Sequence, residues 1–195
     1  MKISIEANIG AGKTTILNRL RDETNIPIFL ESVDSWKMIK PFYSDKSRWG
    51  FAFNLEVLYS MSKYKDYTFP SVYERSPKSN HDVFARLLVD DNSMTQDEFD
   101  LYHKMYDEFS WSQEVMIYIH TSPIVCYERM KNRDRECERH VSIDYVQRIH
   151  DKHEEMIHNI VNSNPRTIIH QVDGNCDKET IYQNVASIVR LYVNN

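Results

Sequence analysis

Apolar residues along the chain fall into two alternating patterns. Short runs that are mostly apolar and rich in β-branched residues are typical of buried strands. Five such runs are present, each bounded by a turn, loop or helix signal: KISIE (2–6), IPIFLE (26–31), SVYER (71–75), VMIYIHT (115–121) and TIIHQVD (167–173). Because they alternate with helical segments, they predict an α/β fold built on a five-stranded parallel sheet.

Between these runs, apolar residues recur at helical spacing. The clearest segments are 47–67, 95–111 and 142–161, and Ser142 is a suitable N-cap for the last of them. With the segment after the first strand, we expect four or five helices to cover the sheet. No internal repeat, low-complexity segment or Pro/Gly/Ser-rich linker divides the chain, so residues 1–195 are expected to form a single domain.

Ligands of open parallel sheets bind outside the carboxyl ends of the strands. This rule directs attention to four places: the loop after Glu6, Glu31, the pair Glu74 and Arg75, and the residues after Thr121. The net charge of -5 argues against bulk attraction to nucleic acid or to an anionic membrane. Any phosphate site must therefore be local.

Cysteine usage and hydropathy indicate the compartment. The chain has three cysteines, Cys126, Cys137 and Cys176, without C-x-x-C spacing, which is typical of reduced thiols that pack or lie on the surface. It contains neither a signal-peptide pattern nor a run of about 18 apolar residues. We expect a cytoplasmic protein without a membrane span.

The loop after the first strand, in EANIGAGKTT, is similar to the phosphate-binding pattern G-x-x-x-x-G-K-[ST], with Ala7 in place of the first glycine. Ala7 is compatible with the loop if its φ is negative. Such a loop binds phosphates with backbone N–H groups, a lysine and a Mg²⁺-binding hydroxyl. The alternative is a small strand-to-helix turn without a ligand. The predicted nucleotide-binding residues are Asn8, Ile9, Gly10, Ala11, Gly12, Lys13, Thr14 and Thr15.

Four motifs extend this interpretation: IEANIGAGKTT, FLESVDSW, YERS and RMKNRDRECE. Their order and spacing resemble the deoxyribonucleoside kinase family, of the mitochondrial thymidine kinase and insect deoxynucleoside kinase type, from residue 2 to about residue 160. The short chain is similar to members from large DNA viruses, which would act in the host cytoplasm. The resemblance implies a P-loop kinase fold that transfers the γ-phosphate of ATP, with Mg²⁺, to the 5′-hydroxyl of a deoxynucleoside in nucleotide salvage. It also implies a homodimer through helices that flank the sheet.

The resemblance implies roles for the ionisable residues at the strand ends. Glu31, with the ordinary pKa of a glutamate, would take the proton from the 5′-hydroxyl. Arg75 would lie beside the 5′-oxygen and the transferred phosphoryl group, where Lys13 also acts. Glu74 would help Thr14 to hold Mg²⁺. From the residues alone, a solvated acid at Glu31 and a structural Glu74–Arg75 ion pair remain alternatives.

A charged segment follows the fourth strand. The resemblance implies a short lid at about residues 129–140, in which Arg129, Arg133 and Arg135 neutralise the phosphates during transfer. A run of charges is more often a solvated helix face, which is our interpretation of Lys131 and Arg139.

A nucleoside pocket is implied in the same way. Trp36 and Phe84 would hold the base between aromatic faces, and both are equally suitable as core residues. Tyr43 and Glu138 would bind the 3′-hydroxyl and leave no room for a 2′-hydroxyl, which favours a deoxy sugar.

The residues expected to read the base depart from the family pattern. Asn54 stands where relatives have glutamine, so the amide is kept with a shorter reach. Val57 and Met61 would line the space around the base, with Asn80 opposite them. An aspartate is common at the Asn80 position in relatives that take purines or deoxycytidine, so its absence favours pyrimidines, with thymidine first.

Two other functions compete with this one. A thymidylate-type nucleoside monophosphate kinase would have an arginine before the strand-end glutamate, where this chain has Leu30. A non-catalytic nucleotide-binding protein would need Lys13 and Thr14 but not Glu31, Arg75 or the lid arginines.

The histidine-rich segment HDKHEEMIH is a candidate metal site. It brings His150, His153 and His158 near Glu154, and two histidines three residues apart share a helix face. No motif elsewhere in the sequence offers further ligands. We therefore interpret the segment as a solvated helix.

Overall fold

The computed structural model describes residues 1–163 and 166–193, except for the side chain of Cys137. Five parallel strands form one sheet in the order β2-β3-β1-β4-β5. They are β1 (Lys2–Glu6), β2 (Ile28–Phe29), β3 (Ser71–Glu74), β4 (Val115–His120) and β5 (Ile168–Asp173). The predicted α/β fold with a five-stranded parallel sheet is confirmed.

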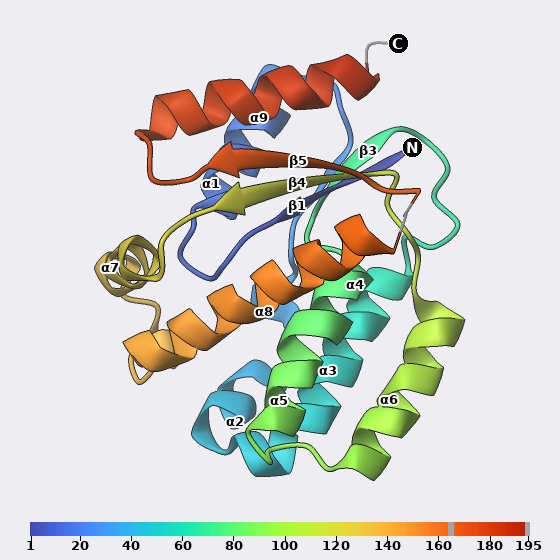
Figure 1. Cartoon of the computed structure of the whole chain (residues 1–195), viewed down its shortest axis with the longest axis vertical. Coiled ribbons are helices and arrows are strands. Elements are labelled where there is room, and N and C mark those ends of the chain that lie inside the picture. Colours follow the sequence, from blue (N-terminus) through green and yellow to red (C-terminus); the bar gives the residue numbers. More distant parts are fainter. Residues whose placement is uncertain (164–165, 194–195) are drawn as a thin grey trace.

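Helices cover both faces of this sheet (Figure 1). On one face lie α1 (Lys13–Glu23) and α9 (Lys178–Val193). On the other lie α8 (Ile143–Asn162), α3 (Lys46–Ser62), α4 (Pro77–Ser79), α5 (Arg86–Asp90) and α6 (Gln96–Phe109). Beyond the carboxyl end of β4 stands α7 (Pro123–Arg133). Shorter segments are α2 (Ile39–Ser44), η1 (Val33–Ser35), η2 (Asn80–Ala85) and η3 (Glu136–Glu138).

The helix count exceeds the expectation. Within the described residues, six helices are longer than ten residues, whereas four or five were expected. Of the described helices, none is long and apolar enough to cross a bilayer.

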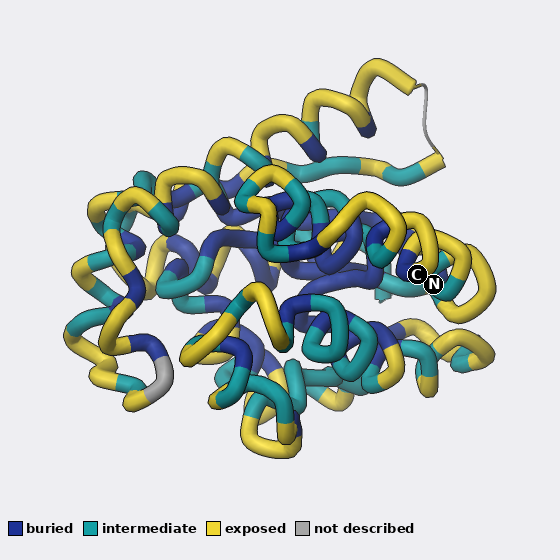
Figure 2. Tube along the Cα trace, turned by 90° about the horizontal axis from the view of Figure 1, so that it is seen from below, coloured by how far each residue is buried: buried dark blue, intermediate teal, exposed yellow. Residues whose placement is uncertain are grey.

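Burial follows the layers, with strands and inward helix faces buried and the outer faces exposed (Figure 2). On the face covered by α1 and α9, Ile5 and Ile117 are fully buried with Leu17. On the opposite face, Met116 packs with Ile149 of α8. The central strands β1 and β4 are thus held on both sides, which fixes the positions of their carboxyl ends.

Two predicted elements are shorter than expected. The helix over 47–67 ends at Ser62, because Tyr64 and Tyr67 leave it and pack their rings on Phe29, with centroids 4.4 and 5.1 Å away. The strand over 26–31 pairs only at Ile28–Phe29, after which the chain leaves the sheet edge. The other two helix predictions are confirmed, and Ser142 caps α8 by accepting from the Tyr145 N–H at 3.2 Å.

One segment has unusual backbone geometry. Residues 77–90 are helical throughout, but Asn80–Ala85 form a π-helix between α4 and α5. Such wide turns occur often at functional sites. This one carries Asn80 and Phe84, two residues predicted for the nucleoside pocket.

Candidate active site

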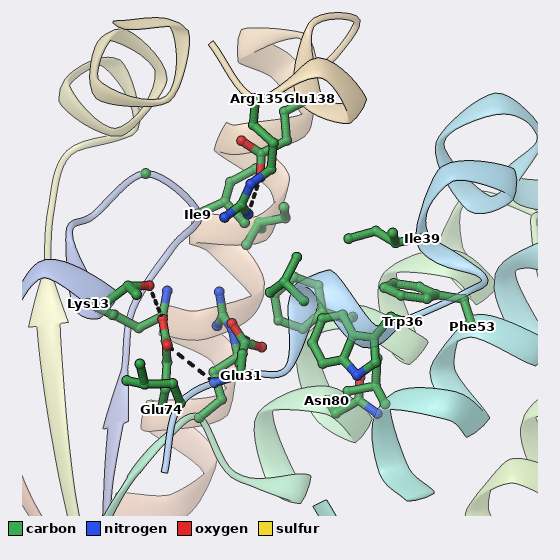
Figure 3. Close-up of a pocket in the computed structure, with 18 of the residues that line it drawn as sticks. Ile9, Lys13, Glu31, Trp36, Ile39, Phe53, Glu74, Asn80, Arg135 and Glu138 are labelled. Carbon is green, nitrogen blue, oxygen red and sulfur yellow. Dashed lines mark hydrogen bonds and ion pairs between the residues drawn. The ribbon is translucent and has the colours of Figure 1, made fainter. Parts of the chain in front are cut away.

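A cavity of about 280 Å³ opens at the carboxyl ends of β1, β2 and β3 (Figure 3). Three of the four predicted places border it: the loop after Glu6, Glu31, and Glu74 with Arg75. The fourth does not. Thr121 is buried beneath the β5–α9 connection, since a Cβ at Gly174 would lie 1.9 Å from its Oγ1.

The loop at one end of the cavity has the backbone of an anion-binding site. Gly10 and Gly12 have φ of 78° and 97°, a region that favours glycine, whereas φ of Ala7 is not positive, as predicted. The Lys13 ammonium bonds the carbonyl oxygens of Ala7 and Asn8 at 3.3 and 3.1 Å. Burial lowers the pKa of Lys13 to about 8, with Arg75 adding to the effect. Bound phosphate would favour its charged form.

Asn8 holds this loop against α8. Its Nδ2 donates to the Val146 carbonyl at 2.9 Å, and its Oδ1 accepts from the Ile9 N–H at 2.8 Å. Its side chain is therefore occupied by the protein, and it is not among the cavity-lining residues.

Glu31 and Arg75 form an ion pair in the middle of the cavity, with Arg75 Nε 3.1 Å from Glu31 Oε1. Burial raises the pKa of Glu31, and the guanidinium of Arg75 opposes that rise. We expected Glu31 to keep the ordinary pKa of a glutamate, and that expectation is wrong because burial raises the pKa. A carboxylate held in this way is a stronger base than a solvated one.

Arg75 is fixed from several sides. Its backbone has φ of 67°, a strained conformation for a residue with a side chain. The guanidinium donates from Nη1 to the Ala7 carbonyl at 2.9 Å and lies 4.6 Å from the ring centre of Phe84. His153 also contacts it, with Nε2 3.4 Å from Nη1. The arginine is thus oriented without any ligand.

The protonation of His153 follows from its partners. Its Nδ1 lies 2.8 Å from the Ile149 carbonyl, which can only accept, so Nδ1 carries the proton and Nε2 accepts from Arg75. Burial, followed by the charge of Arg75, lowers the pKa of His153 well below its ordinary value. The interpretation of a solvated helix is wrong for this residue, which is fully buried.

Thr14 and Glu74 meet at the end of the cavity formed by the glycine-containing loop, where the Thr14 hydroxyl donates to Glu74 Oε1 at 2.6 Å. The second carboxylate oxygen accepts from the Glu31 N–H at 3.3 Å. A hydroxyl and a carboxylate beside a phosphate-type loop are the hard oxygen donors that Mg²⁺ prefers. These residues therefore fit a Mg²⁺ ion.

The arginines of the predicted lid divide into two groups. Arg133 and Arg135 line the cavity, and both are paired with the buried Glu138. Arg133 Nη2 lies 2.5 Å from Glu138 Oε2, and Arg135 Nη1 lies 3.3 Å from Glu138 Oε1. Arg129 does not line it, because its Nη1 donates to the Gly174 carbonyl at 3.0 Å. Arg139 is exposed and paired with Asp134, as expected for a solvated charge.

Aromatic and amide side chains line the other end of the cavity (Figure 3). Trp36 packs edge-on against Phe53, with centroids 5.7 Å apart. Asn54 donates from Nδ2 to the Gly50 carbonyl at 2.9 Å, while its Oδ1 is buried without a hydrogen-bond partner. Asn80 donates from Nδ2 to the Asn54 carbonyl and the Tyr102 hydroxyl. Both amides are thus fixed by the protein.

Most predicted site residues border this one cavity. They are Ile9, Gly10, Gly12, Lys13, Thr14, Thr15, Glu31, Trp36, Tyr43, Asn54, Val57, Met61, Glu74, Arg75, Asn80, Phe84, Arg133, Arg135 and Glu138. The exceptions are Asn8, Ala11 and Arg129.

Several cavity residues were not predicted from the sequence. Tyr145 and Ile149 come from α8, and Phe53, Phe42 and Ile39 come from the α2–α3 region. Their apolar character is that of ordinary core positions, so no sequence signal distinguishes them.

The chain is similar to several known proteins. A family model described as "Deoxynucleoside kinase" matches residues 3–193. The fowlpox virus protein named "Probable deoxycytidine kinase" is 36% identical over 172 residues, covering 80% of this chain and 71% of that protein. Human "Thymidine kinase 2, mitochondrial" is 29% identical over 170 residues, covering 80% and 63%. A solved structure of deoxyadenosine kinase from M. mycoides with bound dCTP matches with a TM-score of 0.86 at 23% identity, covering 98% of this chain and all of that one.

Proposed function

The chain belongs to the deoxynucleoside kinase family, and we propose that within it this protein phosphorylates pyrimidine deoxynucleosides at the 5′-hydroxyl, with thymidine first. Membership makes it an ATP-dependent kinase of deoxynucleosides. The pair of Glu31 and Arg75, held 3.1 Å apart between the phosphate loop and the amide-lined end, carries the proposal. Its position between these two ends supports transfer of a γ-phosphate to a 5′-hydroxyl at this point.

The reaction needs a base, positive charge and alignment. Glu31 accepts the proton of the 5′-hydroxyl as the new O–P bond forms, and its raised pKa suits that transfer. Arg75 and Lys13 stabilise the negative charge on the transferred phosphoryl group. Thr14 and Glu74 would hold Mg²⁺, which when bound would supply positive charge to the phosphates of ATP.

The lid arginines serve both substrates. Glu138 is buried at the cavity wall and, with Tyr43, binds the 3′-hydroxyl of the sugar. Arg133 and Arg135, which Glu138 holds in place, extend toward the phosphates of ATP. Arg129, whose Nη1 donates to the Gly174 carbonyl at 3.0 Å, does not line the cavity and is given no part in the transfer.

The base preference rests on two amides. Asn54 has an unpaired acceptor, Oδ1, and one amide hydrogen left after its bond to Gly50. This pair complements the N3–H and a neighbouring carbonyl of thymine. Asn80 supplies an amide rather than a carboxylate, which supports a pyrimidine. Trp36 and Phe84, with Val57 and Met61 beside them, enclose the ring.

A substrate panel tests this function. Phosphate transfer from Mg-ATP is measured to thymidine, deoxycytidine, deoxyadenosine, deoxyguanosine and thymidylate. We expect thymidine to be used best and deoxycytidine next. Preference for a purine nucleoside would overturn the pyrimidine assignment, use of thymidylate would favour a nucleoside monophosphate kinase, and nucleotide binding without any transfer would favour a non-catalytic protein.

We place the protein in the cytoplasm, that of a host cell if the chain is viral, and the relative from fowlpox virus supports such a source. We also propose a homodimer through helices that flank the sheet. Tyr59 on α3 is 80% exposed, and Leu101 on α6 is 50% exposed, so these packed helices present apolar surface. Light scattering should give twice the chain mass, and a monomer at all concentrations would contradict the proposal.

A further inference from the structure

Three side chains of types that can bind metals lie close together at the end of β4, outside the cavity described above. They are His120, His150 and Glu154, and one candidate ligand atom from each lies within 4.8 Å of the other two. His120 is the last residue of β4, whereas His150 and Glu154 are one turn apart on α8 and share a face of that helix. The partner that the histidine-rich segment lacked in the sequence is thus supplied by a strand 30 residues earlier.

The alternation of β4 explains why these groups meet. Met116, Tyr118 and His120 project from the same face of the strand, toward α8. The Tyr118 hydroxyl donates to Glu154 Oε1 at 2.7 Å, which orients the carboxylate. A hydrogen bond of this kind behind a ligand is typical of metal sites, where it fixes the ligating oxygen.

The distances fit a shared ion. His120 Nε2 lies 3.6 Å from Glu154 Oε1, and the His150 ring centre is 5.2 Å from that of His120. Two ligands bound at about 2.1 Å to a tetrahedral ion are roughly 3.4 Å apart. An ion between these groups therefore needs only small side-chain rotations.

An independent observation concerns His150, whose Nδ1 is buried without a hydrogen-bond partner. Most buried polar atoms in proteins are paired, and an unpaired one costs about 1–3 kcal/mol. A simple ion pair between His120 and Glu154 leaves this nitrogen unexplained. The side chains of His120 and Glu154 are 34% and 46% exposed, so a ligand can enter from solvent.

We propose that His120, His150 and Glu154 bind one divalent transition-metal ion of the Zn²⁺ or Co²⁺ class. Two imidazoles and one carboxylate are a ligand set that these ions prefer, with water in the remaining position. The ion joins α8 to β4 beside His153, the residue that contacts Arg75. It is distinct from Mg²⁺ at Thr14 and Glu74, where the donors are oxygen atoms only.

The test is a titration of the full chain with Co²⁺ in a large excess of Mg²⁺, followed by visible absorption and equilibrium dialysis. We expect one ion per chain and a higher melting temperature with Co²⁺. His150→Gln and Glu154→Gln should each weaken binding by at least about tenfold. His158→Gln is the matched control, because His158 lies one turn or more further along α8, is exposed and should leave affinity unchanged.

Three results would overturn the proposal. They are no bound Co²⁺ in the unaltered chain, equal affinity in all four proteins, or the near-ultraviolet charge-transfer bands of a cobalt–thiolate site. Circular dichroism checks the fold of each variant. If His150→Gln does not fold, Glu154→Gln decides the question, since its exposed side chain tolerates the change.

Discussion

At the scale of single residues, Glu31 lies in the middle of the cavity, and its role in the proposed reaction is to accept a proton. Replacing it by glutamine keeps the shape but removes the base. We expect Glu31→Gln to lower turnover by a factor of about 10² or more while ATP binding stays near normal. Steady-state kinetics and a nucleotide-binding titration measure the two effects.

The exposed Glu136 provides the control for this change, and Glu136→Gln should retain full turnover. Because burial raises the pKa of Glu31, the acid limb of kcat/KM should lie above the value of about 4.3 of an ordinary glutamate. Near-normal turnover of Glu31→Gln would remove Glu31 from the role of base.

Asn54 is the residue on which base selection is expected to depend. Its Oδ1 is unpaired, and a longer side chain at this position moves the acceptor toward the base. We expect Asn54→Gln to change the ratio of thymidine to deoxycytidine use, measured as the ratio of kcat/KM values. Asn159→Gln, on the exposed side of α8, is the matched control. An unchanged ratio in Asn54→Gln would exclude Asn54 from base recognition.

The lowered pKa of His153 leads us to expect that the free energy of unfolding depends on pH. Its pKa is lowered in the folded chain, so below about pH 6.5 the unfolded chain binds a proton that the folded chain does not. The free energy of unfolding should therefore fall as pH falls from 7.5 to 5.5, by about 1.4 kcal/mol more in the unaltered protein than in His153→Gln. Urea unfolding at the two pH values measures this difference. Equal losses would mean that His153 is protonated in the folded state.

At the scale of elements, the phosphate loop and α7 are coupled through one close approach. A Cβ on Gly10 would lie 2.1 Å from the carbonyl oxygen of Cys126 in α7, whereas a Cβ on Gly12 meets nothing within 4 Å. Both glycines have positive φ. Gly12→Ala should therefore cost only backbone strain, about 1–2 kcal/mol, and Gly10→Ala clearly more, with loss of nucleotide binding.

Urea unfolding and titration with ADP measure these two changes. Because the two variants carry the same new methyl group and a similar strain, the difference between them isolates the contact with α7. Equal destabilisation would mean that the loop can move away from Cys126 at no cost.

The elements that sequence could predict are those whose pattern is local. The strands, the loop with Gly10 and Gly12, and the N-cap of α8 depend on neighbours within a few residues. The end of α3 could not be predicted, since Tyr64 and Tyr67 continue the helical spacing but pack on Phe29 of β2.

The site residues also divide into those that the sequence could predict and those that it could not. Glu31, Arg75 and Lys13 belong to recognisable motifs, so their convergence was expected from the strand-end rule. The contributions of α8 were missed because Tyr145 and Ile149 reach the cavity, and His153 reaches Arg75, only through the packing of that helix on β4. The pairing of His120 with His150 and Glu154 has the same origin, which no spacing along one segment reveals.

At the scale of the whole molecule, the cavity lies between the sheet edge and the helices of one face, so a ligand that fills it contacts both layers. Any ligand that binds only the folded chain stabilises it, by about 2.7 kcal/mol at 100 times its dissociation constant. For a chain of this size, that corresponds to a rise in melting temperature of about 5–10 °C. We expect such a rise with thymidine, and a further rise when a non-hydrolysable ATP analogue and Mg²⁺ are added.

Thymidylate is the control in this thermal-shift measurement, because its 5′-phosphate would lie against the carboxylate of Glu31. Like charges at that distance oppose binding in a buried site, and Arg75 is already paired with Glu31. Thymidylate should therefore give a much smaller shift than thymidine at the same concentration. A shift as large as that of thymidine would mean that the cavity accepts a phosphate beside Glu31. Because thymidylate is also the product of the proposed reaction, transfer of a second phosphate to it, measured in the substrate panel, would then decide whether the acceptor is a nucleotide rather than a nucleoside.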